Sequence, residues 1–305
     1  MGRRTVDNLK NTNRTFDNIL DSYLPLDPAS SGQKGAHLRY SALTGYGGTD
    51  LIIGKGGNGS NYTEANPYAE SATQLFPLGT QLVYGDRKFR YVKMDGAVTA
   101  GKLLQQAVHV AHHTNCLVTN ADAVVGSYSH AAGSTTLSIE TAGDTDLTLN
   151  QYAEGYIHVN DAQGEGQLLR VKSHPAHNHG DDPSVVITTY DALATAVVKN
   201  ASQLSLTLNP YKDVIIAPAA ETGAVIGATV IDMTDDYFGW VVTNGPAALL
   251  VGEAVVVLGH RVVRNDSDAG GVMAADSDPL LVPVGQVMAS GVVDTEYALI
   301  MLNIQ

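Results

Sequence analysis

Histidines are the side chains whose spacing in this sequence comes closest to a chemical site. His174, His177 and His179 fall in the run His-Pro-Ala-His-Asn-His-Gly-Asp-Asp, which Asp181 and Asp182 close. Neutral imidazoles beside carboxylates can ligate zinc or a similar ion. A metal site also needs elements that hold these ligands at one point.

The elements around the histidines predict a polar hairpin loop. Pro175 and Gly180 interrupt the run, and strand-like residues around Val171 and Val185 flank it. A loop tip fixes metal ligands only when further side chains orient them. The sequence therefore favours a polar loop that binds neither metal nor cofactor. Metal binding by these histidines is one alternative. A second alternative is a pH-sensitive subunit interface, because histidine titrates near neutral pH.

Nucleophilic and phosphate chemistry have little support in the sequence. Ser129 and Ser290 lack the Gly-x-Ser-x-Gly spacing of a nucleophile elbow. Cys116, the only cysteine, lies in an apolar run and is predicted to be a small core residue rather than a reactive thiol. The glycine-rich run 54–59 lacks the Gly-Lys-Ser/Thr ending of a phosphate-binding loop. We therefore expect no catalytic residues and no enzymatic activity.

Short strands joined by glycine-rich turns dominate the chain after residue 65. Alternating apolar residues around Gly85-Asp86 predict a hairpin over 80–93. The phrase Leu-Thr-Leu-Asn-x-Tyr occurs at Leu147–Tyr152 and returns at Leu206–Tyr211. Short strands are predicted before, within and between the two copies, at 135–140, 146–149, 155–159, 167–172, 184–189 and 204–208.

This pattern predicts an all-β protein with two small barrel or sandwich domains, the second inserted in the first. Residues 66–120 and 215–305 are expected to form one barrel, and residues 121–214 the inserted domain. Residues 1–65 are expected to be an extended N-terminal arm, because their glycine density weakens both helix and strand. The segment 103–113 fits either a strand or a short helix.

Charge is distributed unevenly along the 305 residues. The net charge is −13, yet residues 1–40 hold six basic and four acidic side chains, leaving 12 basic and 27 acidic residues elsewhere. So acidic a body argues against nucleic-acid binding, which needs clustered Lys and Arg. No apolar run reaches the roughly 18–20 residues that span a bilayer, and no signal peptide is recognisable. We expect a soluble protein without a membrane partner, synthesised in a host cytoplasm.

A basic arm on an acidic body suggests docking on an acidic neighbour, although a solvated terminus explains the same charges. Two groups of residues are expected to contact a partner. They are the basic residues Arg3, Arg4, Lys10 and Arg14, and the aromatic residues Tyr40, Tyr46, Tyr237 and Trp240. For Trp240, a place in the core or at an interface is favoured over a sugar-binding platform.

Several phrases together resemble a family of structural proteins of tailed-bacteriophage virions. They are Phe76–Thr80, Phe89–Lys93, Asn150–Tyr156, Gly164–Gln167, Asn209–Tyr211 and Tyr237–Trp240. The resemblance covers about residues 66–305 and implies a capsid decoration or cement protein on the capsid surface of the virion. Its partner would be the major capsid protein. We expect a homo-oligomer, a trimer in the first instance. The alternatives are a self-assembling major shell or tail-tube subunit and a glycan-binding appendage protein.

Overall fold

A computed structural model describes residues 65–119, 130–141, 145–181, 184–252, 257–275, 281–289 and 295–304. The regular elements of this part are β-strands, apart from one 3-10 helix, η1 (Ala111–His113). The all-β prediction is therefore confirmed. The predicted arm lies, up to residue 64, outside the described residues. Within the described part, no helix has the length and apolarity to cross a membrane.

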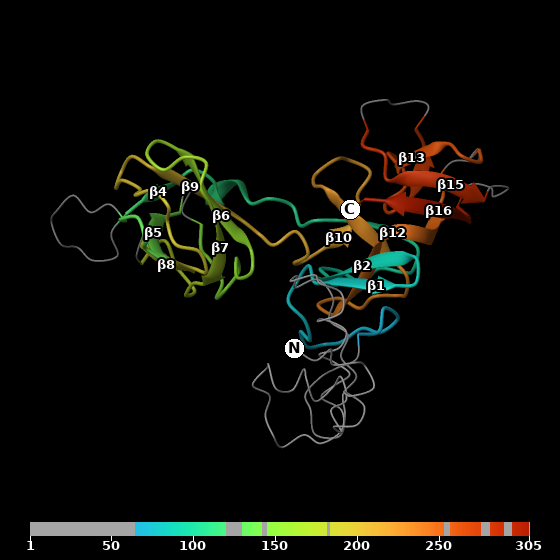
Figure 1. The fold of residues 1–305 in the computed structure, drawn as a ribbon, viewed down its shortest axis with the longest axis horizontal. Coiled ribbons are helices and arrows are strands. Elements are labelled where there is room, and N and C mark those ends of the chain that lie inside the picture. Colours follow the sequence, from blue (N-terminus) through green and yellow to red (C-terminus); the bar gives the residue numbers. More distant parts are fainter. Residues whose placement is uncertain are drawn as a thin grey trace, which may run out of the picture. The chain divides into compact units, whose positions relative to one another are not determined.

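Six strands form a closed antiparallel barrel, drawn in green to yellow in Figure 1. Their order around the barrel is β4-β5-β8-β7-β6-β9, and β9 pairs with β4 to close it. The strands are β4 (Cys116–Val118), β5 (Thr136–Glu140), β6 (Tyr156–Asp161), β7 (Leu168–Ser173), β8 (Ser184–Thr189) and β9 (Gln203–Thr207).

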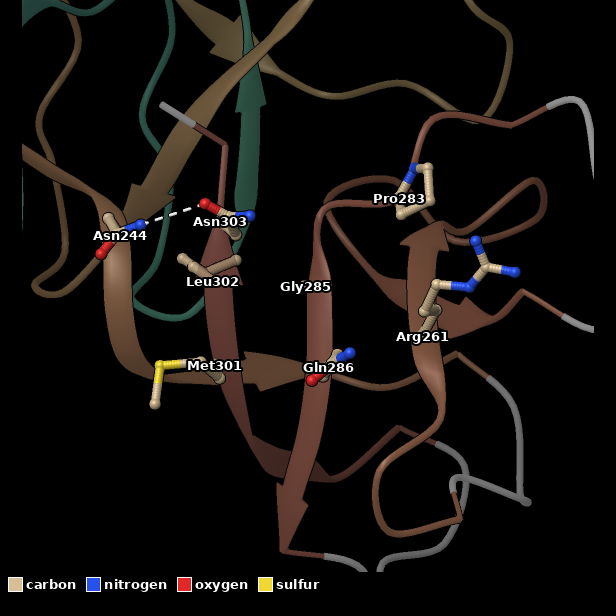
Figure 2. Close-up of a pocket in the computed structure, with 8 residues that line it drawn as sticks. All are labelled: Asn244, Arg261, Pro283, Gly285, Gln286, Met301, Leu302 and Asn303. Atoms are coloured by element: carbon tan, nitrogen blue, oxygen red, sulfur yellow. Dashed lines mark hydrogen bonds between the residues drawn. The ribbon is translucent and has the colours of Figure 1, made fainter.

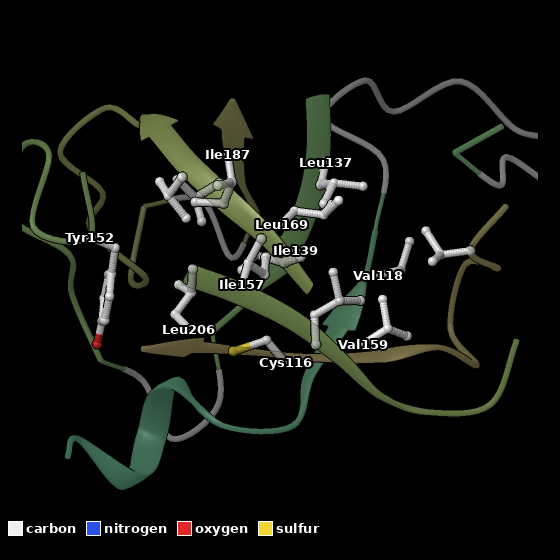
Figure 3. Close-up of a cluster of buried hydrophobic side chains, with 14 of the residues drawn as sticks. Cys116, Val118, Leu137, Ile139, Tyr152, Ile157, Val159, Leu169, Ile187 and Leu206 are labelled. Carbon is white, nitrogen blue, oxygen red and sulfur yellow. The ribbon is translucent and has the colours of Figure 1, made fainter. Parts of the chain in front are cut away.

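The barrel closes because alternate residues of its short strands are apolar. In β8, Val185 and Ile187 are buried while the residues between them are partly exposed. Figure 3 shows these inward side chains meeting in one cluster, which includes Ile139, Ile157 and Cys116. Side chains fill the interior of small barrels in this way. Burial of Cys116 is as the sequence predicted.

The remaining strands form one larger sheet of ten strands. Its main path is β10-β3-β11-β12-β16-β15-β13-β14, and the hairpin β1-β2 joins it through β12. The strands are β1 (Gln81–Tyr84), β2 (Arg87–Lys93), β3 (Leu103–Gln105), β10 (Ile215–Ile216), β11 (Val225–Thr229), β12 (Phe238–Leu250), β13 (Arg261–Arg264), β14 (Val272–Ala274), β15 (Gly285–Ala289) and β16 (Tyr297–Asn303).

Strand β12 connects the parts of this sheet. Its first half pairs with both β2 and β11, and its second half, from Asn244, pairs with β16. The predicted hairpin β1-β2 is confirmed, and the two similar aromatic strands β2 and β12 are neighbours, with Tyr91 opposite Trp240. A parallel bridge between Val251 and Val272 joins the end of β12 to β14. The last five strands of the path therefore curl back on themselves.

The barrel is inserted in the sheet, as the sequence predicted. Strands β3 and β10 flank the barrel segment in sequence and pair with each other, with Gln105 opposite Ile215. Two details differ from the prediction. The first barrel strand begins at Cys116, before the expected boundary at 121. Residues 146–149 contribute a single bridge, Leu147 to His177, and the chain then turns at Asn150, whose φ is 55°.

Residues that follow each copy of the repeated phrase contact the other copy where the chain leaves the barrel. Asn209 donates from Nδ2 to the Glu154 carbonyl oxygen (2.9 Å), and Lys212 donates from Nζ to the Asn150 carbonyl oxygen (3.1 Å). The Glu154 carboxylate in turn accepts from the Leu78 backbone N–H (2.8 Å). Gly155 lies between these groups, where a Cβ would stand 2.5 Å from the Thr207 carbonyl oxygen.

The close approach at Gly155 gives a test of this junction. We expect Gly155→Ala to lower the free energy of unfolding by about 1–3 kcal/mol, because the added methyl meets backbone atoms that cannot move aside. Gly180→Ala is the matched control, since its Cβ would come no closer than 3.4 Å to a side-chain oxygen. Urea denaturation measures both. Equal stability of the two variants would contradict the account.

Candidate functional site

His174 is a buried residue at one end of the barrel. Its Nε2 accepts from the Tyr152 backbone N–H (3.0 Å), and its Nδ1 lies 2.8 Å from the Pro175 carbonyl oxygen, to which it donates. These two bonds define the neutral tautomer with the proton on Nδ1. Both ring nitrogens are thus engaged by backbone, and His174 has no lone pair left for a metal ion.

His177 and His179 belong to the same loop but do not complete a metal centre with His174. The backbone of His177 pairs with Leu147 in both directions, at 2.9 and 2.8 Å. His179 Nδ1 lies 3.0 Å from the Thr141 hydroxyl, and the two imidazole rings are 6.3 Å apart. In the part of the chain that the structure describes, no three His, Cys, Asp or Glu side chains are placed to hold a metal. The geometry is that of the polar hairpin loop.

Burial shifts the pKa values of His174 and Tyr152, which lie at this end of the barrel. Desolvation lowers the pKa of His174, and the nearby positive charge of Lys212 lowers it further, against the raising effect of its bond to Pro175. The Tyr152 hydroxyl is hydrogen-bonded to His113 Nδ1 in the interior, and desolvation raises the pKa of Tyr152. Both side chains, His174 and Tyr152, are therefore neutral at pH 7.

Trp240 lies inside the larger sheet. It is 2% exposed and packs against Tyr91 and Phe76, with ring centroids 5.0 and 5.3 Å away. The Tyr91 hydroxyl closes this aromatic cluster by accepting from the Leu75 backbone N–H (3.1 Å). A sugar could not stack on the indole ring in this arrangement. Of the positions considered from the sequence, Trp240 occupies the core.

The other residues expected to contact a partner are spread along the chain. Tyr237 is half-buried at the turn before β12, where its carbonyl oxygen accepts from the Met94 N–H (2.9 Å). Six of them lie outside the described residues, so their contacts stay predictions: Arg3, Arg4, Lys10, Arg14, Tyr40 and Tyr46. Of the eight predicted residues, the structure therefore describes only Tyr237, at a turn, and Trp240, in the core.

The described feature best suited to binding is an apolar surface that sequence reasoning missed. We call it the outer face, and it comprises Pro246, Ala248, Met288, Tyr297, Leu299 and Met301. The register places Met301 opposite Pro246, and Leu299 opposite Ala248, so these side chains project from the same side of the sheet. The alternation of β16 was visible in the sequence, but both of its faces are apolar, so periodicity alone could not reveal which face is exposed.

Two depressions flank the outer face. The first has a volume of about 340 Å³, and Figure 2 shows four of the residues that line it, Asn244, Met301, Gln286 and Arg261, which come from neighbouring strands. Asn244 donates from Nδ2 to the Asn303 side-chain oxygen there (3.2 Å). The second is a groove of about 550 Å³ that runs past Tyr297 and Leu299 to Asp232 and Tyr68. The apolar row thus has polar margins, as protein–protein contact surfaces do.

Comparisons with protein families, with curated proteins and with solved structures gave no match. The resemblance to phage virion proteins therefore stays a prediction from the sequence phrases. Among the described residues, the outer face is the feature best suited to contact with another protein.

The buried His174 predicts a dependence of stability on pH. Because its folded pKa lies below the unfolded value of about 6.5, the folded protein is favoured above pH 6.5 and loses stability as the pH falls. The loss should approach at most ~1.4 kcal/mol per pH unit for this one proton. We expect His174→Gln to flatten the dependence of the unfolding free energy on pH as the pH falls below about 6.5.

Urea denaturation at a series of pH values measures this slope. His260→Gln, which removes an exposed imidazole, is the matched control. If the slope of His174→Gln equals that of the unsubstituted chain, the buried imidazole is not the group that takes up the proton on unfolding.

Proposed function

We propose that this protein is a non-enzymatic structural component of a bacteriophage virion that binds and stabilises the capsid shell as a decoration or cement protein. The observation that carries the proposal is the outer face, where consecutive outward side chains of β16 are apolar and 38–47% exposed. Contiguous apolar surface of this kind marks an interaction site with other proteins. The virion assignment itself is supported by the sequence resemblance.

The charge distribution supports different roles for the basic N-terminal arm and the acidic β-rich body. The basic residues Arg3, Arg4, Lys10 and Arg14 would dock on acidic surfaces of neighbouring capsid subunits. Ordering such a segment costs about 1–2 kcal/mol per residue in backbone entropy, so many contacts must offset that cost. The all-β body would contribute rigid surfaces. Stabilisation then follows from mass action, because a protein that binds only the assembled shell shifts the equilibrium toward assembly.

A self-assembling shell or tail-tube subunit is the second candidate. The same exposed apolar strand favours it, since such subunits also bury apolar sheet faces against copies of themselves. Abundance separates the two candidates, because a major shell subunit dominates the mass of purified particles. A glycan-binding role gains no support from Trp240, whose indole ring is buried.

Removal of residues 1–40 tests the docking role of the arm. We expect the truncated chain to stay folded and to lose binding to undecorated shells built from the capsid protein of the same virus. Alanine at Arg3, Arg4, Lys10 and Arg14 should weaken binding by about fourfold or more, because four ion pairs contribute about 0.2–1 kcal/mol each. Co-sedimentation at low and high salt measures the loss, since salt screens such contacts.

Circular dichroism of the truncated chain is the control for folding. Full occupancy of shells by the truncated chain would contradict the docking role. Spontaneous growth of the purified chain into tubes or closed shells would instead favour the self-assembling subunit.

A further inference from the structure

Arg264 is a charged side chain that is almost fully buried. It is the last residue of β13, lies opposite Val272 of β14, and is 5% exposed. The guanidinium donates from Nη1 to the Ala220 carbonyl oxygen (3.1 Å), while Nη2 lies 3.6 Å from Glu221 Oε1, too far for a hydrogen bond. Nε is also buried and has no hydrogen-bond partner. In the described part of the chain, the guanidinium edge formed by Nε and Nη2 therefore carries no hydrogen bond.

A buried guanidinium of this kind is suited to a further partner. Burying a charge costs free energy unless hydrogen bonds and an opposite charge compensate, and arginine has five N–H donors to satisfy. Glu221 compensates only in part, because its side chain is 63% exposed and water screens its attraction to Arg264. Two N–H groups on one planar edge match the two oxygens of a carboxylate. Arg264 can therefore bind a carboxylate from outside the described chain.

A cavity of about 250 Å³ lies beside Arg264. Its other walls are mainly apolar and include Val225, Val282, Val284 and Ile304. Val282 is 76% exposed at this cavity, which leaves a large apolar side chain for a ligand to cover. Pockets for drug-sized ligands have volumes of about 300–1,000 Å³, so this cavity fits a smaller molecule. One buried positive charge among apolar walls suits a ligand with one anionic group and a short alkyl group.

The segment 220–224, which contributes to one wall of the cavity, is anchored to the larger sheet. Gln105 donates from Nε2 to Thr222 Oγ1 (2.7 Å), and the Gln106 N–H donates to the Ala224 carbonyl oxygen (3.0 Å). These bonds hold the backbone of the wall without any ligand. A ligand therefore enters a cavity whose wall is already in place, which reduces the entropy cost of binding.

We propose that this cavity binds a small aliphatic monocarboxylate, with its carboxylate on Arg264 and its alkyl group against the apolar walls. One carboxylate oxygen accepts from Nη2, in place of Glu221, and the other accepts from Nε. The exposed Glu221 side chain then turns into the solvent. A free short-chain acid and the C-terminal residue of a polypeptide both offer this chemistry. The site goes beyond the proposed shell binding, and its failure would leave that proposal untouched.

The charges at the cavity favour a monoanion over a dianion. Arg264 and Glu221 are the charged side chains among its described lining residues, and their charges cancel. A monocarboxylate replaces the Glu221 carboxylate one for one, whereas a dianion would add a negative charge next to it. Inorganic phosphate should therefore fail to displace a bound monocarboxylate. Displacement by phosphate at equal concentration would overturn the assignment to monocarboxylates.

Isothermal titration calorimetry of the full chain tests the site, with isovalerate as the branched monocarboxylate. Isovaleramide, which has the same shape without the charge, should bind at least about tenfold more weakly, because hydrogen bonds to charged groups are the stronger ones. Acetate, which lacks the branched alkyl group, should also bind at least about tenfold more weakly, because it buries less apolar area. Equal affinity for isovalerate and either control, or no saturable binding of isovalerate up to about 10 mM, would overturn the proposal.

Substitutions at the two charged residues test the assigned contacts. Arg264→Met should weaken isovalerate binding at least about tenfold, whereas Arg261→Met, at an exposed arginine of the same strand, should leave it unchanged. Glu221→Gln removes the competing carboxylate and should strengthen binding about two- to fivefold. Circular dichroism verifies folding, and the exposed Glu221 provides the test if Arg264→Met does not fold. Unchanged binding by folded Arg264→Met, or no gain on Glu221→Gln, would overturn the proposal.

A dipeptide distinguishes the two sources of the carboxylate. N-acetyl-alanyl-leucine carries a free terminal carboxylate next to a branched side chain, and its amidated form is the matched control. Tighter binding of the acid than of isovalerate would assign the cavity to polypeptide C-termini. Binding of isovalerate alone would assign it to free short-chain acids. Failure of both carboxylates to bind, or equal binding of the amidated peptide and the acid, would overturn the proposal.

Discussion

The larger sheet depends on one strand that serves three neighbours. The 13 residues of β12 bond to β2, β11 and β16, so the two halves of this strand hold together segments from both ends of the described chain. Such pairing requires neighbouring segments to approach the backbone of β12 closely at two of its glycines. A Cβ at Gly245 would stand 2.6 Å from the Asp86 carbonyl oxygen, and one at Gly239 would meet the Met233 side chain. The second half of β12 extends beyond the residues that pair with β2, and there it pairs with β16. This pairing places the outward side chains of the two strands next to each other in the outer face.

Local patterns explain why much of the fold could be predicted from the sequence. The β1-β2 hairpin follows from alternation around a Gly-Asp turn, and several barrel strands follow from short apolar runs between turns. The pairing partners could not be predicted in the same way. Closure of the barrel through β4 and β9 joins Cys116 to Leu204, residues far apart in sequence that no local pattern relates. Short strands such as β10 and β14 have too few residues to show any periodicity.

The candidate site was less predictable than the fold, for physical reasons that differ between residues. The histidine run identified residue types that can bind a metal but not their geometry, because the backbone bonds that engage both nitrogens of His174 depend on Tyr152 and Pro175 in folded positions. Trp240 illustrates the opposite difficulty, since an aromatic residue suits a core and an interface equally well. The exposure of Leu299 could not be predicted, because an apolar residue in an apolar strand can face either the core or the solvent.

The hydrogen-bonded pair of β3 and β10 has an evolutionary consequence. These strands flank the barrel in sequence and lie next to each other in the sheet, with Gln105 opposite Ile215. A gene that lacked the intervening segment would still encode two adjacent strands, which a short hairpin could connect. An insertion at this point leaves the order of the sheet's strands unchanged. The Glu154 carboxylate, which accepts from the Leu78 N–H, is an added contact that would be absent from a chain without the barrel.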